Sequence, residues 1–202
     1  MFWMKKDLKY EILIPPISKP FDQLSKKEAQ QFFDWYMTTM DNRIAYLQSA
    51  SGLELDYSPD SLIPLWKWFL KRAEIEITPE ARLQELEKQL RSANSPFVKE
   101  VLADHAKQLS LETEYILQDI ARYFGEVYVK NYPFIQWGFY SAPKKELNVN
   151  QPVLIGFPNR VFPEKKGVPL PPLHVVRVRA LRLLSNKASK ADLYDLYNIR
   201  RT

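Results

Sequence analysis

Two carboxylates and one histidine are the residues whose types and spacing could support catalysis. Asp119 and Glu126 lie seven residues apart on one face of a predicted helix. Such a pair could perform acid–base chemistry or bind a divalent metal. Arg122 lies between them, and alternating charges at this spacing are typical of an ordinary solvated helix face. His105, which follows Asp104, could be a general base, but a hydrogen-bonded histidine at a helix edge is the simpler interpretation.

Other catalytic and cofactor motifs are missing from the sequence. The five glycines, at positions 52, 125, 138, 156 and 167, allow neither a P-loop nor a dinucleotide fingerprint. There is no G-x-S-x-G elbow and no H-E-x-x-H helix. The chain has no cysteine, which excludes disulfides and thiolate zinc sites, and its two histidines are too few for most histidine-based metal sites. We therefore predict no cofactor, no metal and no named catalytic residue.

Basic residues are concentrated in the last third of the chain. Residues 143–202 contain 12 Lys or Arg against 4 Asp or Glu, whereas the whole chain has a net charge of +5. A solvated surface is the simpler interpretation, and a basic patch that binds phosphates or an acidic protein is the alternative. The candidate residues of that patch are Lys165, Lys166, Arg177, Arg179 and Arg182.

Two further features are candidates for partner binding. Trp68 points away from the apolar stripe of its predicted helix, so it lies either on a second buried face or on an exposed surface. Pro169 and Pro172 form a P-x-x-P pair, which could be a polyproline ligand, although a rigid connector is the simpler interpretation.

The segment 110–140 is the one around which we expect the chain to be arranged. Ser110 is a good N-cap, and apolar residues recur at steps of three and four until Pro133 ends the helix. Gly125 lies beside the apolar face, where we expect another backbone to approach closely. Alternating aromatic residues over 135–140 then predict a strand.

The remaining pattern predicts an α+β fold that is mainly α-helical. We expect about six helices and a small antiparallel sheet of two or three strands in a single domain, 1–202. The helical part covers about 25–132, a hairpin covers about 135–157, and a basic helical segment covers about 171–202. The predicted helices include one over 25–49, one over 79–92 and one over 190–199. Residues 8–14 could form a strand, and 173–184 fits either a helix or a strand, with helix favoured by its length.

Composition limits the cellular setting. Hydrophobic residues make up 46% of the 202 residues, enough for a substantial core. The N-terminal residues lack the apolar region of a secretory signal, and no stretch reaches the roughly 18–20 apolar residues that a membrane helix needs. We expect a cytoplasmic protein with no membrane contact. Its oligomeric state is left open.

Several motifs resemble those of uncharacterised bacterial proteins, including some immunity proteins of toxin systems. The resemblance covers about residues 25–160 and rests on LDYSPDSL at 55–62, Leu65-Trp66, DIARYFGE at 119–126, Pro133, Trp137 and Gln151-Pro152-Val153. It implies a helical domain with a small hairpin and no known catalytic residues. Our leading expectation is a non-enzymatic protein-interaction domain, and one form of it is an immunity or antitoxin-like inhibitor. The alternatives are nucleic-acid binding through the basic residues of 143–202 and a small carboxylate-based enzyme.

Overall fold

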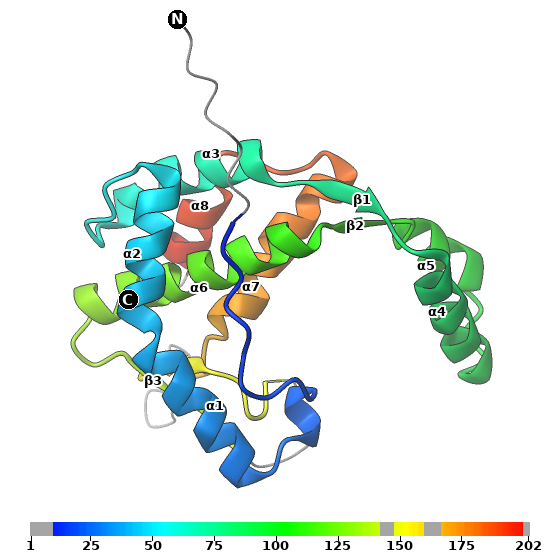
Figure 1. The fold of residues 1–202 in the computed structure, drawn as a ribbon, viewed down its shortest axis with the longest axis horizontal. Helices are drawn as coiled ribbons and strands as arrows, with labels where there is room; N and C mark the ends of the chain where they lie inside the picture. The colour runs from blue at the N-terminus through cyan, green and yellow to red at the C-terminus, as the bar shows by residue number, and fades with distance from the viewer. Residues whose placement is uncertain (1–9, 142–147, 160–166, 200–202) are drawn as a thin grey trace, which may run out of the picture.

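The computed structural model describes residues 10–141, 148–159 and 167–199. Over these ranges the chain forms eight α-helices and two antiparallel two-stranded sheets (Figure 1). The predicted class, α+β and mainly helical with a small antiparallel sheet, is confirmed, with two more helices than expected and a second sheet. The described helices include none that is long and apolar enough to cross a membrane.

Along the chain, a helical N-terminal part is followed by a projecting pair of helices and then by a part that contains both helices and strands. The helices are α1 (Lys26–Thr38), α2 (Met40–Ser51), α3 (Leu62–Arg72), α4 (Glu80–Ser92), α5 (Val98–Asp104), α6 (Leu111–Asn131), α7 (Pro172–Ala180) and α8 (Asp192–Ile199). The strands are β1 (Ile75–Ile77), β2 (Lys107–Leu109), β3 (Gln136–Gly138) and β4 (Val153–Ile155). Short 3-10 helices are η1 (Phe21–Gln23), η2 (Pro59–Ser61) and η3 (Leu181–Ser185).

Helix α6 is the centre of the fold. Its N-cap is Ser110, whose side chain accepts a hydrogen bond from the backbone amide of Thr113 at 3.2 Å, as the sequence predicts. Every residue of 119–128 is buried, because α2, α3, α7 and β3 contact the helix and Tyr197 of α8 packs on Tyr128. The prediction of a solvated charged face on this helix is therefore wrong for Asp119, Arg122 and Glu126.

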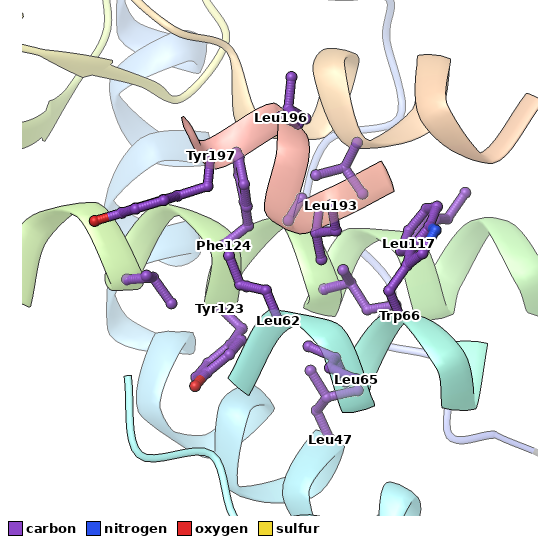
Figure 2. Close-up of a cluster of buried hydrophobic side chains, with 14 of the residues drawn as sticks. Leu47, Leu62, Leu65, Trp66, Leu117, Tyr123, Phe124, Leu193, Leu196 and Tyr197 are labelled. Atoms are coloured by element: carbon purple, nitrogen blue, oxygen red, sulfur yellow. The ribbon is translucent and has the colours of Figure 1, made fainter. Parts of the chain in front are cut away.

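The core joins α3, α6 and α8. Figure 2 shows side chains of α3, α6 and α8 packed together, with Leu47 of α2 beneath them. The fully buried members drawn there include Leu62, Leu65, Trp66, Leu117, Phe124 and Leu193. The indole Nε1 of Trp66 also donates to the backbone oxygen of Ser189 at 3.1 Å, which ties α3 to the segment before α8.

The helix predicted over 25–49 is interrupted at Thr39. Its capping box is present, since Ser25 accepts from the Glu28 amide and the Glu28 side chain accepts from the Ser25 amide. The hydroxyls of Thr38 and Thr39 donate to backbone carbonyls one turn earlier, at 2.9 Å and 2.8 Å. Such bonds compete with the helical pattern and often bend helices. Two helices, α1 and α2, result.

The predicted hairpin of 135–157 is present. Strands β3 and β4 are antiparallel, with Trp137 opposite Leu154. The ring of Trp137 lies against Gly125 of α6, in the space that a Cβ would occupy. Close approach at this glycine is therefore made by a side chain, and the expectation of a second backbone there is wrong.

For three other segments, the structure differs from the sequence prediction or decides between two predicted alternatives. Residues 10–14 form no strand, and the first two residues of that predicted strand lie outside the described ranges. The segment 173–184 is helical, as α7 and η3. Strands β1 and β2 were not predicted; they pair with Ile75 opposite Leu109 and Ile77 opposite Lys107.

Strands β1 and β2 form a ribbon that carries α4 and α5 away from the rest of the chain (Figure 1). We call residues 75–109 the arm and the remaining described residues the body. No residue of α4 or α5 is buried, and no residue of 78–106 belongs to the hydrophobic core. The helix predicted over 79–92 therefore lies on the surface, as α4. The arm has no closed core of its own.

Candidate functional site

The carboxylate of Asp119 is the centre of a buried charged cluster. Arg43 of α2 donates through Nη2 to Oδ2 at 2.6 Å and through Nε to Oδ1 at 3.1 Å. Arg122 donates through Nη1 to Oδ1 at 3.1 Å, and the hydroxyl of Tyr10 donates to Oδ2 at 2.8 Å. Each of these four residues is at most 5% exposed. The cluster joins the N-terminal segment, α2 and α6.

The pKa values of Tyr10 and Arg43 in this cluster, and of the neighbouring Tyr36, are raised. Burial, followed by the charge of Asp119, raises the pKa of Tyr10 far above its ordinary value, and burial also raises that of Tyr36. Burial works against the charged form of Arg43, but hydrogen bonding to Asp119 and the charge of that carboxylate outweigh it and raise its pKa. The tyrosines therefore stay neutral and Arg43 stays charged at physiological pH.

Glu126, the second carboxylate of the predicted pair, has a different partner. Its Oε1 accepts a hydrogen bond from Nε1 of Trp137 at 2.7 Å. The guanidinium of Arg122 lies over the ring of Tyr36, 4.4 Å from its centroid, while its Nε and Nη2 are buried with no hydrogen-bond partner. With Asp119 held by two arginines and Glu126 held by an indole, the geometry favours a structural role for both carboxylates.

His105 lies at the C-cap of α5. Its Nδ1 donates to the backbone oxygen of Val101 at 2.7 Å, and the ring is exposed. The neighbouring Asp104 is exposed as well. In the part of the chain that the structure describes, no three His, Asp or Glu side chains are grouped so that they could hold a metal ion.

Two of the predicted basic residues form ion pairs inside the body. Arg177 of α7 pairs with Glu114 of α6 at 2.8 Å, and Arg182 of η3 pairs with Asp192 of α8 at 2.7 Å. Arg179 is half-buried on α7. The other two candidates, Lys165 and Lys166, lie outside the described residues.

The other predicted binding features also contact the body. Trp68 is half-buried and packs against the hydrophobic core, so its second helix face is partly covered. Pro172 is the first residue of α7 and is buried. Pro169 and Pro172 therefore do not form an extended polyproline ligand, and the connector interpretation is the correct one.

A wide groove lies between the arm and the body. Its volume is about 1320 Å³, and its walls come from α4, α5 and β2 on one side and from α7 and η3 on the other. The apolar residues that line it are Leu83, Leu86, Leu109, Leu111, Leu181 and Leu184. The charged ones are Glu76, Arg82, Glu85, Asp104, Lys107, Glu114 and Arg177.

Apolar pairs face the groove from both walls. Leu83 and Leu86 lie about one turn apart on α4, and Leu181 and Leu184 have the same spacing on η3. All four side chains are only half-buried. The groove exceeds the roughly 300–1,000 Å³ of small-molecule pockets and is open to solvent, as grooves that hold a helix are.

The sequence pattern indicates only one of the two apolar walls of this groove. The narrow leucine stripe of the 79–92 helix is visible, but the wall opposite is contributed by η3, about 90 residues later in the chain. Comparison of the chain with protein-family models, with curated proteins and with solved structures finds no match in any of the three. Function is therefore inferred from the described residues and their contacts.

Proposed function

We propose that this protein acts by binding another polypeptide, and that a helix of that polypeptide lies in the groove between arm and body. One observation carries the proposal. Helices α4 and α5 bury no residue completely, although Leu83 and Leu86 face half-buried leucines across the groove. A helical hairpin without a closed core gains stability when another apolar surface covers it.

The charges of the groove favour a protein ligand over nucleic acid. Four acidic and three basic residues line it, and Arg177 is already neutralised by Glu114. Nucleic-acid binding depends on several cations that are free to contact phosphates. An immunity-type inhibitor, one form of the interaction domain that we expect from the sequence, would act in the proposed way by holding a segment of its toxin.

Affinity capture in cells of the native host tests the proposal. The tagged chain would be compared with its Leu86→Glu and Leu184→Glu variants, which each place a charge in one wall of the groove. Ile14→Glu is the matched control, because Ile14 is 77% exposed and does not line the groove. We expect the wild type and Ile14→Glu to retain one stoichiometric polypeptide and both groove variants to lose it.

Two results would contradict the proposal. One is the absence of any stoichiometric polypeptide, an untagged copy of this chain included, and the other is a polypeptide that all four forms retain equally. Titration of the purified chain with duplex and single-stranded DNA and RNA at two salt concentrations tests the nucleic-acid alternative separately. Tight binding that weakens steeply with salt would favour that alternative.

A further inference from the structure

Helix α4 carries a row of three leucines, Leu83, Leu86 and Leu90, which we call the seam. The spacing of these leucines suggests which polypeptide occupies the groove. We infer that it is a second copy of this chain, and that two copies pair through parallel α4 helices. The inference rests on the proposed function, because it names the partner of the same groove.

Helix α4 has the residue spacing of a coiled-coil helix. Leu83, Leu86 and Leu90 are separated by three and four residues, which places them at positions a, d and a of a heptad. None of the three is buried within its own chain. A second helix with the same spacing would cover Leu83 and Leu86, the two leucines that line the groove.

The flanking charges select the parallel orientation. Arg82 and Glu87 occupy positions g and e, five residues apart, and in a parallel pair g of one helix faces e of the other. Because the pair has twofold symmetry, the Arg82–Glu87 contact forms twice. In an antiparallel pair, e faces e, so Glu80 and Glu87 of the two copies would repel each other.

Arg82 and Glu87 each have polar atoms available for contacts with the second copy. The bond from Arg82 to Gln108, 2.7 Å long, uses only Nη1. The bonds from Arg91 to Glu87 use only Oε1 of that carboxylate. Nε and Nη2 of Arg82 and Oε2 of Glu87 are left for contacts between copies.

The groove gives the second helix its other wall. Because Leu83 and Leu86 line the groove, a helix paired with them lies between α4 and η3. The same contact repeats from the other copy, so the interface is isologous and closed. Helix α4 of each copy thus lies between α4 and η3 of the other copy.

Sedimentation equilibrium of the full chain tests the pairing. We expect a dimer that Leu86→Glu converts to a monomer, with Ile14→Glu as the control that stays dimeric. Arg82→Glu and Glu87→Arg should each raise the dimer Kd about tenfold, because each replaces two attractions by two repulsions. The double variant Arg82→Glu/Glu87→Arg should return the Kd to the wild-type value.

The chain contains no cysteine, so an introduced one is its only thiol. Oxidation of Leu83→Cys should yield a disulfide-linked dimer, since position 83 meets its own copy only in the parallel pair, whereas Ile14→Cys should stay monomeric under denaturing conditions. A monomeric wild type, or a double charge reversal that fails to restore the dimer, would overturn the inference. A monomer whose groove still captures a different polypeptide would overturn it and leave the proposed function standing.

Discussion

The indole ring of Trp137 lies against the backbone of Gly125, so that strand β3 rests directly on helix α6. The Nε1 of the same ring donates to Oε1 of Glu126, the next residue of the helix, at 2.7 Å. Ring and hydrogen bond together hold the hairpin on the central helix. Glycine is required at position 125 because any Cβ would overlap the ring.

Gly125→Ala should therefore destabilise the protein. Alanine in a helix is ordinarily favoured over glycine by about 1 kcal/mol, but forcing a methyl group into a packed site typically costs about 1–3 kcal/mol. We expect the overlap with Trp137 to outweigh the helix gain and lower the free energy of unfolding, measured by urea denaturation. Gly125→Ala/Trp137→Phe should lose less than the two single changes predict together, because phenylalanine lacks the outer ring. Additive losses would contradict the proposed overlap.

Asp119→Asn should be among the most destabilising single substitutions. It removes the buried negative charge that Arg43 and Arg122 share, and breaking a buried ion pair costs about 3–5 kcal/mol. The exposed carboxylate of Glu11, 3.8 Å from Nη1 of Arg43, stays in place. Asp34→Asn is the matched control, since Asp34 is exposed and the hydrogen bond that it accepts from Gln30 contributes about 0.5–1.5 kcal/mol. Equal losses in guanidinium denaturation would show that Asp119 has no special structural role.

Local signals account for what the sequence predicted correctly. The Ser110 cap and the β3–β4 hairpin depend on residues close in the chain. The buried cluster could not be predicted in this way. Arg43 and Tyr10 are 76 and 109 residues from Asp119, and charges at helical spacing have the same pattern on a solvated face as on a buried one.

The arm was missed for a different reason. Strands β1 and β2 have three residues each, and their pairing joins segments about 30 residues apart. Such short strands give too few positions for an alternating pattern to stand out from a loop. The 79–92 helix between them was predicted, but the ribbon that makes this region an arm depends on the long-range pairing. The groove follows from the ribbon and was therefore not predictable either.

Glu28 should make the stability of α1 depend on acid pH. Its hydrogen bonds with Lys19 and with Ser25 lower its pKa from 4.5 to about 2. A lowered pKa in the folded state means that its stabilisation is complete above pH 4.5 and is lost as the pH falls towards 2. The difference in unfolding free energy between wild type and Glu28→Gln should shrink over this window. A difference that stays constant down to pH 2 would contradict the cap interaction.

The body should fold without the arm helices. Replacing residues 79–105 by Asn-Gly would join Thr78 to Ala106, whose backbones already form a hydrogen bond of 3.0 Å, through a two-residue hairpin turn. Because no residue of 78–106 belongs to the core, the free energy of unfolding should change by only about 1 kcal/mol, while dimerisation and partner capture are lost. Leu109→Ala is the contrasting control at the base of the arm, where a side chain 3% exposed should cost about 2–5 kcal/mol. If the shortened chain lost cooperative unfolding in circular dichroism, the arm would be part of the folding unit.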